Sequence, residues 1–257
     1  FVKISGDYRV QARTEGARNV GIDAKEKYSR DAEVLKKALL DEPENARYQF
    51  YLAQSYFDSQ QWENSLEAYK KRVEMGGWNE EIFYSQYRVG LISAILKKPH
   101  EIIIKEFMEA YSIRPIRAEP LVEISRIYRM NDKPAAAFPF ARLAADMPYP
   151  ENDILFISED IYRFGALDEL GAVAYYAGRP EEGYHACKKL MEDGRVAPEH
   201  LERVQKNLQQ YEQVMSQIQV NKMQADMQAQ VDKLKKRKEE KELQKKATYK
   251  KKKAKSR

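Results

Sequence analysis

The chain has few of the residues that would indicate metal, redox or disulfide chemistry. It contains one cysteine, Cys187, which cannot form an internal disulfide, and three scattered histidines, His100, His185 and His200. No C-x-x-C, H-E-x-x-H or G-x-x-x-x-G-K motif occurs. We therefore predict no metal, no cofactor and no catalytic residue in this chain. We expect Cys187 to be a small buried apolar residue in a reducing compartment, which favours a cytoplasmic location, either free or peripheral to a membrane.

Long hydrophobic runs are also missing. One of the longest, AAAFPFA at 135–141, is far shorter than the roughly 20 apolar residues that span a bilayer. The chain begins at Phe1 without a signal-like segment, and we expect it to be a piece of a longer protein. Of the 257 residues, 43% are hydrophobic and 33% are charged, which suits a helical solenoid with a solvated extension.

The stretch from Asp41 to Trp78 has the pattern of a helical hairpin. Its apolar positions recur at helical spacing, and the small residues Ala53 and Ser65 would let the two helices approach closely. Asn45 suits an N-cap. The connecting segments suit a turn and a stop: DSQQ at 58–61 and GG at 76–77. Together these features are typical of a tetratricopeptide-type repeat.

The repeat recurs in a degenerate form. Small residues at the equivalent position are Ala53, Gly90, Ser125 and Gly171, separated by 37, 35 and 46 residues. The last interval is long because residues 148–167 insert about ten residues beyond the usual repeat length. Their prolines and apolar side chains predict a packed excursion. Pro139 falls within a predicted helix, where a kink is expected.

We predict an all-α fold, a right-handed superhelix of four tetratricopeptide-like hairpins over residues 23–195. Alternating residues at 1–22 favour a short β remnant of an upstream domain. Residues 196–234 carry apolar side chains at heptad spacing from Leu201 to Leu234. They would form either a capping helix on the last repeat or a dimeric coiled coil.

Residues 235–257 form a strongly basic segment. They contain 13 Lys and Arg against 3 acidic residues, a net charge of +10, whereas the rest of the chain has 32 basic and 37 acidic residues, a net charge of −5. Because few apolar side chains accompany these charges, we expect a disordered tail. Its partner would be an anionic membrane or a polyanion, bound in a salt-dependent manner. A merely solubilising role is the alternative.

Three long motifs carry a resemblance to a known family. They are KYSRDAEVLKKALLDEPENARYQFYLAQSYFDSQQWENSLEAYKKRVEMGGWNEEIFYSQYRVG, RPIRAEPLVEISRIYR and LDELGAVAYYAGRPEEGYHACKKLM. Over residues 8–195 the chain resembles the helical-repeat C-terminal half of bacterial and viral family 2 glycosyltransferases. The resemblance implies an accessory scaffold that helps position an acceptor or partner near an upstream catalytic domain. No Asp-x-Asp motif occurs, so this chain alone is not expected to be the transferase.

In repeats of this type the first helix of each hairpin lines a concave groove, where we expect ligand contacts. The groove candidates are Phe50, Gln54, Phe57, Tyr87, Arg126, Arg129 and Tyr175. Arg126 and Arg129 would share a helix face suited to an anionic group, and aromatic rings suit sugar faces. The alternative is structural: the rings pack, and the arginines are solvated or pair with Glu119 or Glu123.

A second function class is open on the sequence alone. A free-standing tetratricopeptide adaptor would bind a protein segment in its groove and an anionic surface through its basic tail. Paired carboxylates such as Glu80 and Glu81 stand where a helix begins, and complementing the helix dipole accounts for them without catalysis.

Overall fold

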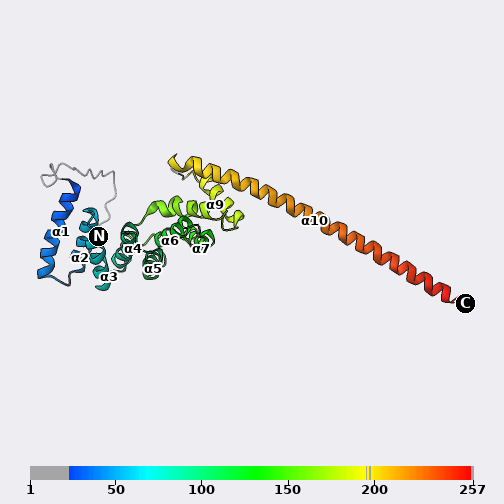
Figure 1. The fold of residues 1–257 in the computed structure, drawn as a ribbon, viewed down its shortest axis with the longest axis horizontal. Coiled ribbons are helices and arrows are strands. Elements are labelled where there is room, and N and C mark those ends of the chain that lie inside the picture. The colour runs from blue at the N-terminus through cyan, green and yellow to red at the C-terminus, as the bar shows by residue number, and fades with distance from the viewer. Residues whose placement is uncertain (1–22, 195, 197, 256–257) are drawn as a thin grey trace. The chain divides into compact units, whose positions relative to one another are not determined.

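The computed structural model describes residues 23–194, 196 and 198–255. Within these residues there are ten α-helices and one π-helical turn, and no strand (Figure 1). The predicted all-α fold is thus confirmed, whereas the predicted β remnant at 1–22 lies outside the described residues. The chain divides into two compact units, the first ending at Glu169 and the second beginning at Leu170. None of the described helices is both long and apolar enough to cross a membrane.

The first unit is a row of antiparallel helices. Consecutive helices pack against one another, and α2 with α3, α4 with α5, and α6 with α7 form the predicted hairpins. The elements are α1 (Ala24–Asp41), α2 (Ala46–Asp58), α3 (Trp62–Glu74), α4 (Asn79–Ile95), α5 (His100–Ile113), α6 (Glu119–Met130), α7 (Pro134–Ala145) and the π-helical turn η1 (Ile161–Gly165). Pro139 lies inside α7, as the sequence predicts.

The first hairpin has the local features that its sequence indicates. The Asn45 side chain caps α2 by accepting a hydrogen bond from the Tyr48 amide at 3.1 Å. Ser65 is fully buried and its hydroxyl donates to the Ala53 carbonyl at 2.9 Å. These two small residues therefore mark the place where α2 and α3 approach closely, as predicted. Gly76 and Gly77 follow α3 with φ of +67° and +93°, which glycine adopts without strain.

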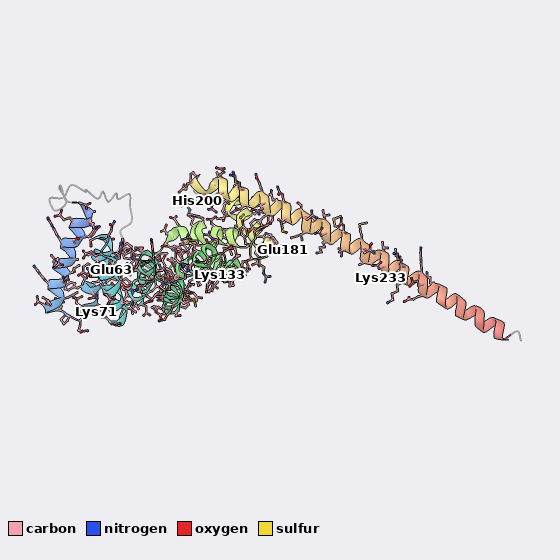
Figure 2. The ribbon with its side chains drawn as sticks, in the orientation of Figure 1. Glu63, Lys71, Lys133, Glu181, His200 and Lys233 are labelled. Atoms are coloured by element: carbon pink, nitrogen blue, oxygen red, sulfur yellow. The ribbon has the colours of Figure 1, made fainter. Side chains whose placement is uncertain are left out.

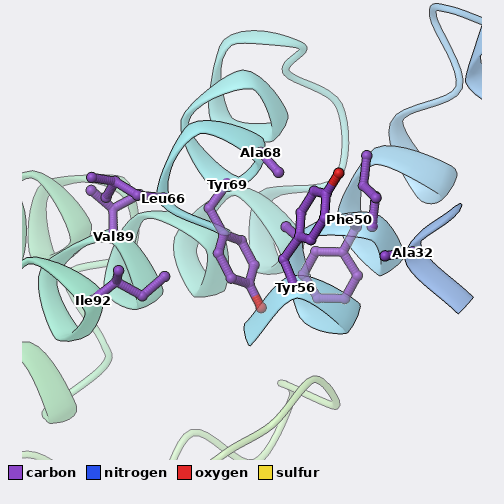
Figure 3. Close-up of a cluster of buried hydrophobic side chains, with 10 residues drawn as sticks. Ala32, Phe50, Tyr56, Leu66, Ala68, Tyr69, Val89 and Ile92 are labelled. Carbon is purple, nitrogen blue, oxygen red and sulfur yellow. The ribbon is translucent and has the colours of Figure 1, made fainter. Parts of the chain in front are cut away.

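The core of the first hairpin is apolar and continuous with the helices on either side. Phe50, Tyr56, Tyr69 and other side chains from α1 to α4 form one cluster (Figure 3). Phe50 and Tyr69 meet edge to face, with ring centroids 6.3 Å apart. Burial of each such side chain stabilises the folded state by about 1.5–3 kcal/mol. The apolar contacts between neighbouring helices are therefore the main interaction that holds α1 to α4 together.

The second unit contains α9 (Pro180–Glu192), α10 (Pro198–Lys255) and the end of α8 (Ala166–Val173). Small residues lie at the helix contacts of this unit, among them Gly171, which the sequence predicts to mark the fourth hairpin. A Cβ on Gly171 would lie 2.7 Å from Sγ of Cys187, and one on Gly183 would lie 2.2 Å from the ring of Tyr211. Cys187 is 1% exposed, which confirms its predicted burial. Glycine at positions 171 and 183 therefore lets α8 and α10 pack this closely on α9.

The helix α10 differs from its prediction at the C-terminal end. Its first part packs on α9 through the buried residues Val204 and Tyr211, which is a capping arrangement. The structure then continues the helix to Lys255, where a disordered tail was expected from 235 on (Figure 1). No glycine or proline follows Pro198, and Gln, Lys, Glu, Ala and Leu predominate, so helix propensity is high throughout.

Candidate functional site

The long connection between α7 and η1 returns to helices that lie much earlier in the sequence. Figure 1 shows the chain after α7 coming back to the vicinity of α4 before it enters α8. We call residues Asp153–Ser158 the strap. Its contacts are with α2, α4 and the start of α6, the first helices of three successive hairpins. The predicted packed excursion is confirmed, and it lies along the face that was expected to hold a ligand.

The main chain of the strap is held by charged side chains. Oε2 of Glu80 accepts hydrogen bonds from the amides of Ile154 and Leu155, each at 2.8 Å. Arg117 donates to the next two carbonyls, those of Leu155 at 3.4 Å and Phe156 at 3.1 Å. Further along, Glu119 and the Ser158 amide are 3.2 Å apart. Side chains thus supply the hydrogen-bond partners that this irregular backbone would otherwise find in a strand or helix.

The strap begins at a buried carboxylate. Asp153 is 5% exposed and forms a two-point ion pair with Arg114, in which Nε of Arg114 donates at 2.6 Å. Nη1 of Arg117 approaches the same carboxylate at 3.2 Å. The hydrogen bond from Arg114 keeps the pKa of Asp153 below its usual value, although burial opposes this. Asp153 therefore stays ionised and fixes the start of the strap.

Arg117 and Glu119 form the centre of this polar network. Both side chains are almost fully buried, and Nη2 of Arg117 donates to Glu119 at 2.7 Å. The Tyr162 hydroxyl donates to Glu119 at 2.8 Å and accepts from the Ala118 amide at 3.0 Å. The Arg117 guanidinium also lies 4.5 Å from the centre of the Phe83 ring. Every charged group in the network is thus paired, as a buried charge requires.

The apolar side chains of the strap cover part of the predicted groove. Leu155 packs against the core cluster of the first hairpin. The ring of Phe156 lies 4.7 Å from that of Tyr84 and stacks on Phe50 at 6.5 Å. Phe50 is consequently 1% exposed. Phe50 was predicted to contact an external ligand, and in the structure it contacts a segment of its own chain.

Two other predicted aromatic residues are also packed within the first unit. Tyr87 stacks on Phe83 and lies 5.6 Å from Phe107, and burial raises its pKa. Phe57 lies under the guanidinium of Arg88, 3.4 Å from ring centroid to Cζ. These contacts match the structural alternative that the sequence left open. Gln54 is half-buried and lines a hollow of about 370 Å³ between α1 and α2, together with Tyr28, Asp31, Val34, Leu35, Tyr51, Ser55 and Asp58.

The structure brings Arg126 and Arg129 together, around a buried glutamate. Arg129 donates two hydrogen bonds to Glu169, at 2.9 and 3.0 Å, and Arg126 pairs with Glu123 at 2.8 Å. Glu169 is 4% exposed and also accepts from the Ser125 hydroxyl. The pairing with Glu123 is as predicted, whereas Glu119 pairs with Arg117 instead. The arginines are therefore held in ion pairs, and their binding of an external anion remains a prediction.

Tyr175, the last predicted site residue, belongs to the second unit. It is 38% exposed, and its ring meets those of Tyr176 and Tyr211 edge to face. Its amide donates to the Tyr211 hydroxyl at 2.8 Å. The backbone of Tyr175 thus helps to hold α10, while part of the ring remains accessible.

Sequence reasoning missed the residues that hold the strap. Glu80 and Glu81 do stand in the first turn of α4, but they are 7% and 3% exposed and specifically paired. Glu81 pairs with Arg72, at 2.9 Å, and with Arg47. A signal was present in RPIRAE at 114–119, where two arginines and a glutamate precede or begin a helix instead of lying on its exposed face. Charges at such positions favour specific pairing.

Comparisons with known proteins support the fold. Two crystal structures of MamA superpose with TM-scores of 0.50, at 16% and 17% identity; they match 68% and 65% of this chain and 96% and 82% of their own. YrrB, described as a TPR protein with an unusual peptide-binding site, has a TM-score of 0.47 at 12% identity, covering 65% of this chain and 78% of its own. No protein-family model and no curated protein sequence matches the chain. The fold is a tetratricopeptide-like helical repeat.

Proposed function

We propose that this chain is a non-catalytic helical-repeat scaffold that binds a non-helical protein segment along the first helices of its hairpins. The observation that supports this function is the strap, a segment with neither helix nor strand structure that is bound on that face through its main chain. Main-chain recognition by Glu80, Arg117 and Glu119 does not depend on the bound sequence, whereas apolar contacts such as that of Phe156 with Tyr84 add selectivity.

The binding groups are already in place, which favours a binding role. Arg117 and Glu119 pair with one another at 2.7 Å, and Glu80 stands in the first turn of α4, whose backbone fixes its position. Side chains that are ordered before binding do not lose rotamer freedom when a segment binds, so more of the contact energy appears as affinity. A segment with a leading carboxylate and three following apolar residues, as in Asp153–Phe156, fits these groups.

The resemblance to family 2 glycosyltransferases leads to a finer proposal. In this proposal the chain is the accessory half of such an enzyme, and the bound segment belongs to the catalytic domain, to a protein partner or to the acceptor. The alternative is a free-standing adaptor with a basic C-terminal segment for anionic surfaces. An α/β domain with an Asp-x-Asp motif encoded upstream of Phe1 would support the first, and an initiator methionine there would support the second.

The peptide-binding proposal is tested by uncovering the groove. Replacing Leu155 and Phe156 by Gly removes the side chains that cover Phe50 and Tyr84 but keeps the Asp153 anchor. A fluorescent peptide of sequence NDILFISE, from residues 152–159, is expected to bind this variant at least about tenfold more tightly than the unaltered chain, because the internal competitor is weakened. Fluorescence polarisation measures the difference.

A peptide in which glycines replace the same Leu and Phe serves as the matched control and should bind weakly to both proteins. Circular dichroism checks that the variant retains its helical content. Equal binding of both peptides to the folded variant, or no binding of either, would contradict a groove that recognises segments like the strap.

A further inference from the structure

A stripe of exposed apolar side chains lies on the part of α10 beyond its contact with α9. The stripe residues are Val220, Met223, Met227, Val231 and Leu234, with exposed fractions of 46, 59, 65, 43 and 58%. Their spacing of three, four, four and three residues places all five within an arc of about 80° on a helix of 3.6 residues per turn. Lys233 marks this exposed region in Figure 2. Five aligned apolar side chains on a solvent-facing helix indicate a docking surface.

This stripe is separate from the face that joins α10 to its repeat. Val204 and Tyr211 are 1% and 2% exposed. At 100° per residue, Met227 points about 140–160° around the helix axis from those two side chains. Docking of α10 on α9 therefore leaves the stripe available for a different partner.

We infer that the stripe binds a second copy of this chain, with the two α10 helices antiparallel and Met227 at the two-fold axis. The stripe residues are spaced symmetrically about Met227, with neighbours four and seven residues away on each side. An antiparallel pair thus places Val220 opposite Leu234 of the other copy, and Met223 opposite Val231. The separation of 11 residues from Val220 to Val231 corresponds to 3.67 residues per turn, close to the straight α-helix, so two such helices can pair with little supercoiling.

Charge selects the antiparallel direction. Residues 235–257 carry a net charge of +10, and a parallel pair would align two such segments side by side. An antiparallel pair places them at opposite ends of the contact. Within 220–234, the lysines at 222 and 233 balance the aspartates at 226 and 232, and Gln224, Gln228 and Gln230 flank the stripe without charge. The low charge beside the stripe is typical of the core of an interface.

The dimer is tested by sedimentation equilibrium of the full chain. Five side chains per copy make a small interface, and we expect a Kd in the range of about 1–100 μM. M227K places two positive charges at the two-fold axis and should weaken association at least about tenfold. A229K adds the same charge on the opposite side of the helix, where residue 229 is exposed, and should leave association unchanged. A monomer at the top of that concentration range, or equal loss in both variants, would overturn the proposal.

Cross-linking tests the direction of the pair. In an antiparallel dimer, V220C and L234C chains should form a disulfide-linked dimer when mixed, and neither variant should cross-link alone. Cross-linking of each variant with itself, and not with the other, would establish a parallel pair and overturn the antiparallel assignment. The native Cys187 is 1% exposed and should not compete.

Discussion

Replacement of Arg117 by Ala is expected to lower the free energy of unfolding by about 3–5 kcal/mol, the usual cost of removing one partner of a buried ion pair. Glu119 would lose its main partner while remaining 1% exposed, and Asp153 would keep only Arg114. The carbonyls of Leu155 and Phe156 would also lose their donor. Urea unfolding followed by circular dichroism measures the change.

Arg126→Ala is the matched control for this substitution. It removes the same side chain from a neighbouring element, but Arg126 is 39% exposed and its main partner, Glu123, lies on the same helix. A partly solvated pair of this kind contributes less than about 1 kcal/mol. Similar losses for Arg117→Ala and Arg126→Ala would show that the network around the strap is no more important than an ordinary surface pair.

Tyr211→Ala is expected to destabilise the second unit by about 3–5 kcal/mol, because it removes a buried aromatic side chain. The ring fills the space left by Gly183, and the hydroxyl donates to the Gly171 carbonyl while accepting from the Tyr175 amide. The first turns of α10 should separate from α9. Amide hydrogen exchange in α9 would report this as a loss of protection.

Two further substitutions divide the Tyr211 effect into its parts. Tyr211→Phe keeps the ring and removes the hydroxyl, and should cost about 1–3 kcal/mol because two backbone groups lose their partner. Tyr176→Ala removes a ring that is 69% exposed and should have little effect on protection in α9. If Tyr211→Ala changes the amide protection in α9 no more than Tyr176→Ala does, Tyr211 does not hold α10 against α9.

The sequence predicted the hairpins because their determinants are local. The small residue Ala53, the cap at Asn45 and the glycines at 76–77 each act within one repeat, and helical spacing shows which residues face inward. The same reasoning correctly predicted the burial of Cys187 and a packed segment after α7. These features need no knowledge of how distant repeats are arranged.

The occupied groove could not be predicted in the same way. Glu80 and the Ile154 amide are 74 residues apart, and periodicity identifies an inward face without identifying what covers it. Phe50 was therefore assigned to an external ligand, although Phe156 of the same chain lies against it. Arg114 follows the end of α5, and Arg117 and Glu119 stand at the start of α6, where no periodic pattern assigns them a partner.

Hydrogen exchange at the amides of Ile154 and Leu155 shows directly whether the first-helix face binds the main chain of the strap. In the unaltered chain both amides should exchange slowly, because each donates to the buried carboxylate of Glu80. Glu80→Ala should accelerate their exchange at least about tenfold, whereas Glu63→Ala, on an exposed position of α3, should not. Exchange of Ile154 and Leu155 at the rate of a free peptide in the unaltered chain would contradict the account.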